Sequence, residues 1–281
     1  MQKKNLLRNA LIASSLFSAV TTANARNKYL FVYFSGNNPQ QEQIRYAVSD
    51  DGFNYAPLNG GNPVVSSDTI ARTGCVRDPH ILRTKKGEYL MVVTDMRSSL
   101  GWSSNRGMVL LKSRDLIHWQ HHTIHFPEKY AGTNFANVTR VWAPQTIYDE
   151  KADKYMVYFS LLTNDGTIPY DRVYWAYANA DFSDLEGEPQ VLFDFKAPAI
   201  DTDIVQDKKG EYHLFFKTEQ EGAHKVIRQY VFRDLHNPSS WTLLDGFCEQ
   251  TKDNVEGAGV FPLIGGGWCL MYDCYMSGHY Q

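Results

Sequence analysis

The sequence has few cysteines, and none with the spacing of a metal site. Its 281 residues include four cysteines, with no C-x-x-C pair and no Cys/His zinc pattern. Cys269 and Cys274 are five residues apart on one expected strand, so they point to opposite faces and cannot form a disulfide. Cys75 and Cys248 could pair after export, although we favour buried free thiols.

The chain also lacks an excess of basic residues and a long apolar run. Its 28 basic and 31 acidic residues are well mixed, which excludes a basic stripe for nucleic acid. The one apolar stretch, residues 10–20, follows a basic start at 3–8, precedes Ala23-Asn24-Ala25 and is too short to span a membrane. We therefore expect a signal peptide over 1–25 and an exported monomer over 26–281, periplasmic or extracellular, with no membrane span.

Aromatic residues are abundant, and they mark a repeat. Five apolar segments of similar design begin with an aromatic residue and recur about every 60 residues. A turn containing Asp and an apolar or aromatic residue also recurs, out of phase with these segments. Repeats of four-stranded units at such intervals are typical of β-propellers. The sequence therefore predicts an all-β, five-bladed propeller whose repeats begin their aromatic segments at Tyr29, Tyr89, Tyr155, Tyr212 and Trp268.

The first and last repeats are short. After the expected signal peptide no room remains for a strand before Tyr29, and the sequence stops at Gln281, shortly after the second strand of the fifth repeat. We therefore expect blades one and five to be short of strands and the closing C-terminal strands of the propeller to be missing. Such a ring would have exposed edges, which natural sheets avoid.

Carboxylates recur at one place in the repeat. Asp78 and Asp201 each precede the aromatic residue of their repeat by eleven positions, and Glu256 precedes its own by twelve. Pro144 takes the corresponding place in the third repeat. Because innermost strands surround the propeller axis, we expect the three carboxylates to converge on one axial pocket. The alternative is that each caps a turn.

Three converging carboxyls suit glycoside hydrolysis. That reaction needs one protonated carboxyl for the leaving oxygen and one ionised carboxyl to activate water or attack. The apolar, Gly-rich surroundings of Glu256 would raise its pKa and suit the acid. Asp78 follows Arg77 in a polar turn, which suits the ionised base. Asp201 could keep the acid protonated by like-charge repulsion.

Several motifs follow one another along the chain: Asn62-Pro63, Arg77-Asp78-Pro79-His80-Ile81, Trp142-Ala143-Pro144-Gln145, Ala199-Ile200-Asp201-Thr202-Asp203-Ile204 and Val255-Glu256-Gly257. Together they resemble glycoside hydrolase family 43. The resemblance implies an enzyme with a five-bladed propeller fold that inverts the configuration at the anomeric carbon. Such enzymes include α-L-arabinofuranosidases and β-xylosidases. It implies that Asp78 is the general base, Asp201 the pKa-modulating acid and Glu256 the general acid. Relatives usually have Gly in place of Thr202, and Asp203 is a competing modulator.

The sequence gives no basis for a metal or cofactor. Family members normally continue into a closing segment with an axial His that can help hold a metal ion. His279, in Ser-Gly-His-Tyr-Gln, does not match that segment. His121, His122 and His125 fall on an expected outer strand. We therefore assign no metal ligand and no cofactor.

Further polar and aromatic residues lie near the expected strand ends and could bind or stack on a sugar, or equally serve packing and turns. These candidate substrate-binding residues are Asn37, Asn38, Asp95, Trp102 and Trp142.

The sequence thus predicts an exported, exo-acting, inverting glycosidase that releases α-L-arabinofuranose from plant polysaccharide or oligosaccharide. A β-xylosidase of the same family is the nearest alternative. A carbohydrate-binding protein or an inactive, truncated propeller is the third, because neither end of the chain supplies a closing strand.

Overall fold

The computed structural model describes residues 28–246 and 251–281. The predicted signal peptide and Cys248, with its possible pairing to Cys75, lie outside these residues. Within the described ranges, no helix has the length and apolar character needed to cross a membrane.

Five antiparallel sheets form the molecule, and we number them as blades 1 to 5 along the chain. Blades 1 and 2 contain β1 (Tyr29–Tyr33), β2 (Arg45–Ser49), β3 (Ala56–Pro57), β4 (Val76–Arg83), β5 (Tyr89–Asp95), β6 (Gly107–Ser113) and β7 (Trp119–His125). Blade 3 contains β8 (Val138–Asp149), β9 (Lys154–Thr163), β10 (Arg172–Ala178) and β11 (Leu185–Phe193). Blades 4 and 5 contain β12 (Ala199–Gln206), β13 (Tyr212–Thr218), β14 (Ile227–Phe232), β15 (Thr242–Leu243), β16 (Glu256–Pro262), β17 (Trp268–Cys274) and β18 (His279–Tyr280).

Helices are short and lie between strands. The α-helices are α1 (Ser67–Ile70) and α2 (Phe126–Lys129), and the 3-10 turns are η1 (Asn59–Gly61), η2 (Ser98–Leu100), η3 (Asn134–Asn137) and η4 (Pro238–Ser240).

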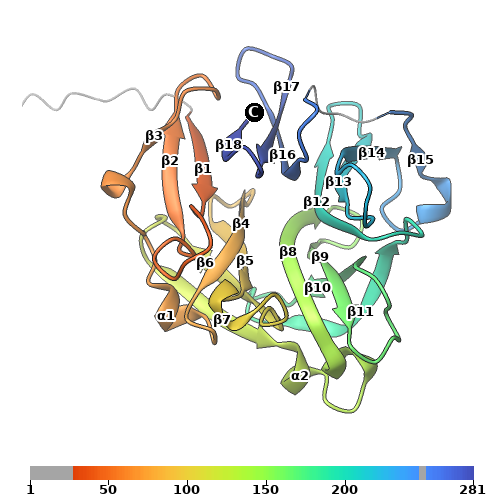
Figure 1. The fold of residues 1–281 in the computed structure, drawn as a ribbon. Helices are drawn as coiled ribbons and strands as arrows, with labels where there is room; N and C mark the ends of the chain where they lie inside the picture. Colours follow the sequence, from red (N-terminus) through yellow and green to blue (C-terminus); the bar gives the residue numbers. More distant parts are fainter. Residues whose placement is uncertain (1–27, 247–250) are drawn as a thin grey trace, which may run out of the picture.

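The blades surround a common centre, which confirms the five-bladed propeller (Figure 1). Strands β4, β8, β12 and β16 are the innermost strands of blades 2 to 5. In the described residues, blades 1 and 5 have three strands each, as the sequence predicted. By its aromatic start at Tyr29, β1 corresponds to the second strand of the other blades, and it borders the centre itself.

The recurring Asp turn has the same physical cause in blades 1 and 2. In blade 2, Asp115 Oδ1 accepts the backbone N–H groups of Ile117 and His118, at 2.9 and 2.8 Å. In blade 1, Asp51 Oδ1 accepts two N–H groups in the same way, each at 2.8 Å. These Asx-type bonds close the turn before the outermost strand, so the repeat seen in the sequence is a repeat of turn chemistry.

Blades pack face to face through apolar side chains that alternate along each second strand. On β5, Leu90 and Val92 pack toward blade 3, whereas Met91 and Val93 pack toward blade 1. This is the period of two expected for a strand buried on both faces. Four such clusters fill the junctions between blades 1 and 2, 2 and 3, 3 and 4, and 4 and 5.

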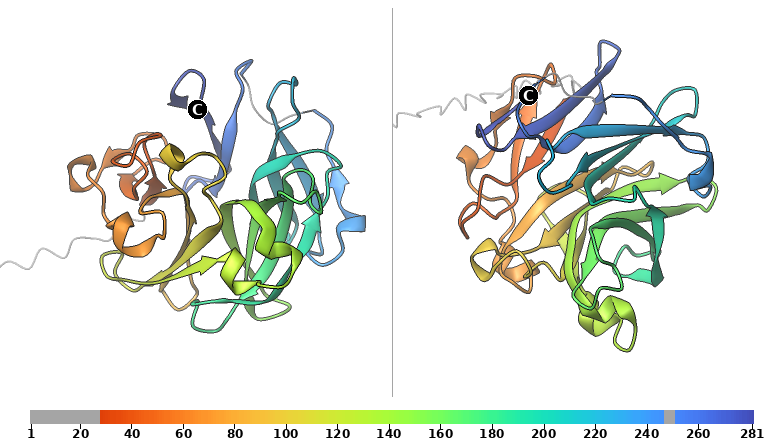
Figure 2. Two further views of the ribbon diagram at one scale, coloured as in Figure 1. Left: turned by 60° about the horizontal axis from the view of Figure 1, so that its bottom comes forward. Right: turned by 45° about the vertical axis from the view of Figure 1, so that its right-hand side comes forward.

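The junction between blades 5 and 1 is built differently. The last blade lies beside the first, so the two ends of the described chain are neighbours (Figure 2). The rings of Tyr29 and Phe261 are 5.5 Å apart, as are those of Phe31 and Tyr280. Tyr29 also accepts a 2.5 Å hydrogen bond from the backbone N–H of Ile264. Aromatic contacts thus close the ring where the other junctions have clusters of buried side chains.

Candidate active site

A β-bulge recurs in all four innermost strands. In each ladder the pairing skips two residues on the inner strand, and the first of them has a positive φ. These residues are Asp78 (51°), Ala143 (48°), Asp201 (51°) and Gly257 (64°). A bulge bends its strand and re-aims the side chain it carries. Two of the four bulges therefore aim a carboxylate at the axis.

The predicted register is wrong by one residue in two blades. Glu256 lies one residue before its bulge, which Gly257 occupies, and Pro144 lies one residue into the bulge that begins at Ala143. Eleven positions before Trp268 is Gly257, so the count of eleven holds in blade 5 and the carboxylate there simply lies outside the bulge. In blade 3 the bulge begins twelve positions before Tyr155, because that hairpin is one residue longer.

The axial cavity nevertheless brings the three predicted catalytic residues together. Asp78, Asp201 and Glu256 line a cavity of about 730 Å³ and also a second of about 420 Å³. The larger is lined mainly by polar and aromatic side chains, and the smaller by the inner strands. The three carboxyls come from blades 2, 4 and 5.

Asp78 is fixed by one hydrogen bond. The hydroxyl of Thr94 donates to Asp78 Oδ2 at 2.7 Å, and it accepts the backbone N–H of Ala143 at 2.9 Å. The hydroxyl proton is thereby directed to the carboxylate. The other oxygen, Oδ1, has no hydrogen-bond partner in the described part of the chain, so it is available to a molecule in the cavity.

Asp201 holds its proton more tightly than an ordinary Asp. Burial, and then the negative charges of Glu256 and Asp78, raise its pKa to about 7, against the opposing effect of Lys217. The backbone N–H of Gly257 donates to Asp201 Oδ2 at 3.1 Å. Asp201 therefore exchanges a proton near neutral pH, beside Glu256.

Glu256 has a charged partner, so the expectation of purely apolar surroundings is wrong. Lys217 Nζ donates to Glu256 Oε2 at 2.6 Å, and the same ammonium contacts Glu219. The Lys217 side chain is only 4% exposed, and Nζ lies 4.8 Å from the ring centre of Tyr275. Burial alone would lower the pKa of Lys217, but Asp201 and Glu256 raise it overall.

Sequence reasoning missed Lys217 and also Asp273, although a repeat marks both. The fifth residue after each opening aromatic of β5, β9, β13 and β17 is polar. It pairs with the inner-strand residue directly before the bulge. Burial, followed by the charge of Glu256, raises the pKa of Asp273 to about 6. The four polar residues are Thr94, Ser160, Lys217 and Asp273.

Three of the five predicted substrate-binding residues line the larger cavity. Asn37 Oδ1 accepts a 2.6 Å hydrogen bond from Arg77, whose guanidinium lies 5.3 Å from the ring centre of Trp102. Trp102 is 50% exposed, so its ring is free to stack on a sugar. Trp142 donates through Nε1 to Asp171 Oδ1 at 3.1 Å, which fixes its ring at the cavity wall.

The other two predicted binding residues do not line either axial cavity. Asn38 Oδ1 accepts the backbone N–H groups of Gln40 and Gln41, each at 3.1 Å, and so closes the turn after β1. Asp95 is 3% exposed and accepts the backbone N–H groups of Arg72 and Thr73. Asn38 thus serves a local turn, whereas Asp95, at the end of β5, fixes the segment that leads into β4.

Asp203, the competing modulator, occupies a different place. It lines only the smaller cavity and accepts the N–H of Val260 at 2.7 Å. Burial raises its pKa to about 7, with no contribution from Glu256. Asp201 is therefore the carboxyl whose protonation is linked to Glu256.

The axial carboxyls do not form a metal-binding group with other side chains. In the described ranges, ligating side chains converge at two places, and neither includes Asp78, Asp201 or Glu256. His121 and His122 are exposed on outer strand β7 and belong to neither group. The residues at the axis thus do not fit a side-chain metal cage, and we derive no step through one.

Comparison with known proteins places this architecture among carbohydrate enzymes. A family model described as "Probable glycosyl hydrolase domain", related to glycoside hydrolase family 43, matches residues 24–281. An α-L-arabinofuranosidase of Bifidobacterium longum subsp. longum is 30% identical over 207 residues, which is 66% of this chain. The match spans only 19% of that relative's length.

Solved structures share the fold at low sequence identity. An endo-arabinase of Bacteroides thetaiotaomicron has a TM-score of 0.64 and 16% identity, covering 87% of this chain and 84% of its own. An endo-1,4-β-xylanase of the same species has a TM-score of 0.63 and 12% identity, and the match covers 88% of this chain and 81% of the xylanase. An α-L-arabinofuranosidase of Lactobacillus brevis has a TM-score of 0.62 and 13% identity, and the match covers 88% of this chain and 80% of the arabinofuranosidase.

Proposed function

The chain belongs to the glycosyl hydrolase family related to glycoside hydrolase family 43, and we propose that it is an exo-acting, inverting α-L-arabinofuranosidase. The observation that carries this proposal is the convergence of Asp78, Asp201 and Glu256 from three blades on one axial cavity. The name of the Bifidobacterium relative supports the choice of sugar. A cavity at the axis suits a single terminal residue of a plant polysaccharide, reached after export of the chain.

Asp78 is the proposed general base. Thr94 engages one of its oxygens and leaves the other free toward the cavity. A water held by that free oxygen would lose its proton as it attacks the anomeric carbon. In an inverting enzyme this water stands between base and sugar, on the face opposite the leaving group.

Glu256 is the proposed general acid, supported by Asp201. The leaving oxygen must receive a proton, and Asp201, with its pKa raised to about 7, keeps one in the same cavity. The ammonium of Lys217 contacts the carboxylates of both Glu256 and Glu219, so it partly neutralises the negative charge of each. Trp102 and Trp142 are the proposed stacking surfaces for the sugar and its neighbour.

The activity is tested with the purified chain on nitrophenyl α-L-arabinofuranoside and nitrophenyl β-D-xyloside. We expect faster hydrolysis of the arabinofuranoside. Faster hydrolysis of the xyloside would make the chain a β-xylosidase. Inactivity on both, with retained binding to arabinan or arabinoxylan, would make it a carbohydrate-binding propeller.

The stereochemistry is tested by a proton NMR time course of the released sugar. Inversion predicts that the first anomer to appear has the configuration opposite to that of the substrate, before mutarotation mixes the two. A first-formed sugar with the substrate's configuration would exclude inversion and make one carboxylate a nucleophile.

A further inference from the structure

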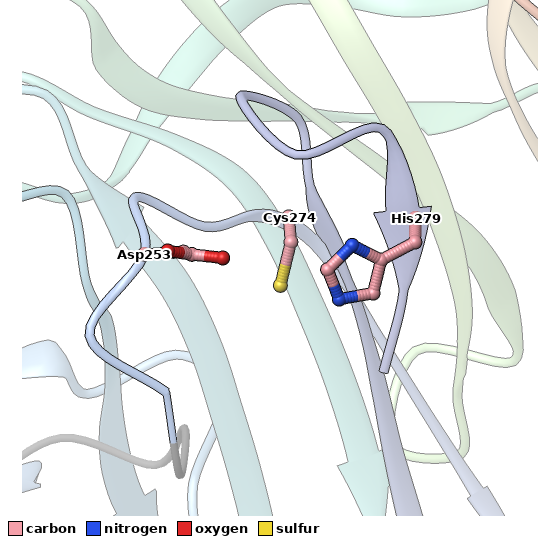
Figure 3. A group of neighbouring side chains, drawn as sticks. All are labelled: Asp253, Cys274 and His279. Atoms are coloured by element: carbon pink, nitrogen blue, oxygen red, sulfur yellow. The ribbon is translucent and has the colours of Figure 1, made fainter.

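Three potential metal ligands converge in the last blade. Asp253, Cys274 and His279 each offer one ligand atom, and these atoms lie within 4.8 Å of one another. Figure 3 shows the carboxylate, the thiol and the nitrogen-bearing edge of the imidazole turned toward a common space. Thiolate, imidazole and carboxylate are the ligands that Zn²⁺ takes in proteins. We propose that Asp253, Cys274 and His279 bind one zinc ion, with water as the fourth ligand.

The backbone holds two of the ligands in register. Cys274 and His279 are directly opposite in the β17–β18 ladder, so their side chains emerge on the same face. The turn between them is closed by the N–H groups of Ser277 and Gly278, which both donate to the carbonyl of Cys274 at 2.9 Å. The pair is therefore positioned without a metal, and little ordering is needed to bind one.

The third ligand comes from a separate segment that is anchored to blade 4. His224 Nε2 lies 2.8 Å from the carbonyl oxygen of Asp253, and the N–H of Lys225 donates to Asn254 Oδ1 at 2.8 Å. Ser277 donates to Asp253 Oδ2 at 2.7 Å, and the carboxylate offers one oxygen to the group. A hydrogen bond to the second oxygen is the arrangement that orients a metal-binding carboxylate.

The thiol lies in surroundings that favour a cation. Cys274 is a buried free cysteine with no hydrogen-bond partner in the described chain. A zinc ion would supply the missing positive charge and stabilise the thiolate. The half-buried Asp253 and the exposed His279 leave one side open to water, as a fourth ligand requires.

A second converging group, Asp207, Glu211 and His213, does not support the same inference. Asp207 Oδ1 already accepts the N–H groups of Lys209 and Glu211, each at 2.8 Å. His213 Nδ1 is paired with the amide of Gln229 at 2.9 Å, as His279 Nε2 is with that of Gln281 at 3.2 Å, so this contact does not separate the two groups. The second group has no thiol, and His213 Nε2 and Asp207 Oδ2, 3.9 Å apart, are partners of each other. These contacts make an ordinary turn between β12 and β13, and they provide a matched control.

The zinc site would adjoin the axial cavity. Tyr275, Gly278 and His279 line the larger cavity, so a bound ion would fix its rim. It would also tie the segment that leads into β16, and hence Glu256, to the β17–β18 turn. The inference concerns binding and does not depend on which sugar the enzyme cleaves.

Metal binding is tested on the purified chain after chelation, loading with Zn²⁺ and removal of free metal by gel filtration. We expect about one bound equivalent by elemental analysis, and a rise in Tm of about 5 °C at a hundredfold excess over Kd. Cys274→Ala and His279→Ala should each weaken binding at least tenfold. Cys269→Ala, on the same strand, and Asp207→Asn should bind as the wild type does.

Loading with Co²⁺ identifies the thiol directly. A thiolate-to-cobalt charge-transfer band should appear in the wild type and in Cys269→Ala, and be absent from Cys274→Ala. Because His279 is exposed, His279→Ala should fold normally and still lose the Zn²⁺-dependent rise in Tm. This variant therefore tests the zinc site even if Cys274→Ala does not fold. No bound metal in the wild type, or an unchanged stoichiometry in His279→Ala, would overturn the proposal.

Discussion

At the scale of single residues, one buried ammonium balances the carboxyls of the cavity. Lys217 contacts Glu256 and Glu219 and lowers the pKa of Asp201. Lys217→Met should therefore raise the pKa of Asp201 above about 7 and move the basic limb of the kcat/KM profile to higher pH. Lys225→Met, which removes a cation near Glu219 only, is the control and should leave that limb in place.

The two proposed catalytic roles separate by leaving group. Glu256→Gln should slow substrates with poor leaving groups by about 10²–10⁴, and activated aryl glycosides far less, because only the former need a proton on the leaving oxygen. Asp78→Asn should slow both alike, since water must be activated in every case. Equal losses for both substrates in Glu256→Gln would show that Glu256 is not the acid.

Asp203 makes stability depend on pH. Burial raises its pKa in the folded protein to about 7 from 3.8, so the folded state binds this proton more tightly than the unfolded state. The stabilising contribution of Asp203 is then fully present below about pH 4 and is lost as pH rises through about 7. Asp203→Asn should remove up to roughly 4 kcal/mol of that fall, measured by urea unfolding between pH 4 and 8. An unchanged slope would show that Asp203 titrates normally.

At the scale of elements, the bulges of the innermost strands are the feature on which the site depends. Gly257 has φ 64°, and a Cβ there would meet no atom within 4 Å, so Gly257→Ala costs backbone strain alone. We expect a loss of about 1 kcal/mol in unfolding free energy and a larger fall in kcat, because this bulge positions Glu256 and donates to Asp201.

Gly259→Ala is the matched control on the same strand. Its Cβ would lie 3.9 Å from the carbonyl oxygen of Met271, an ordinary contact, and its φ is not in the left-handed region. We expect wild-type kcat. A similar fall in both variants would mean that the strand, not the bulge, is what the substitution disturbs.

The sequence predicted the elements better than their exact register. Aromatic starts and Asp turns repeat because each blade reuses the same strand and turn chemistry. Asp78 and Asp201 were therefore found at equivalent places. Glu256 was assigned to the same position and lies one residue earlier, because Gly257 occupies the bulge. The count of eleven finds Gly257 in blade 5 but misses Ala143 in blade 3 by one residue, since nothing in the sequence marks the extra residue of that hairpin.

Side-chain roles were predicted less well. Asn38 and Asp95 have the right chemistry and position for sugar binding, but nearby backbone N–H groups use their oxygens. Lys217 and Asp273 were overlooked because each lies one residue before the end of an apolar strand that resembles core. Their shared place, five residues after the opening aromatic, was the available sign, since a charged residue there in a buried strand needs a partner.

At the scale of the whole molecule, the five junctions between blades differ. Phe193 lies in the buried cluster between blades 3 and 4, whereas Phe261 contacts Tyr29 at the junction of blades 5 and 1. Phe193→Ala should cost about 3–5 kcal/mol in unfolding free energy, as a core truncation does. Phe261→Ala should cost less and increase amide exchange mainly in blades 1 and 5. Uniformly faster exchange across all blades would contradict this.

The same junction has a consequence for inactivation. Asp78 and Asp201 belong to blades 2 and 4, away from the aromatic closure, while Glu256 belongs to blade 5, which borders the closure on one side and is joined to blade 4 by a buried cluster on the other. If blade 5 moves outward when that closure opens locally, the proposed acid Glu256 leaves the cavity, while the proposed base Asp78 and the proposed modulator Asp201 stay in place. Heating should therefore abolish turnover reversibly several degrees below the calorimetric transition, with Asp78 and Asp201 still in their folded positions.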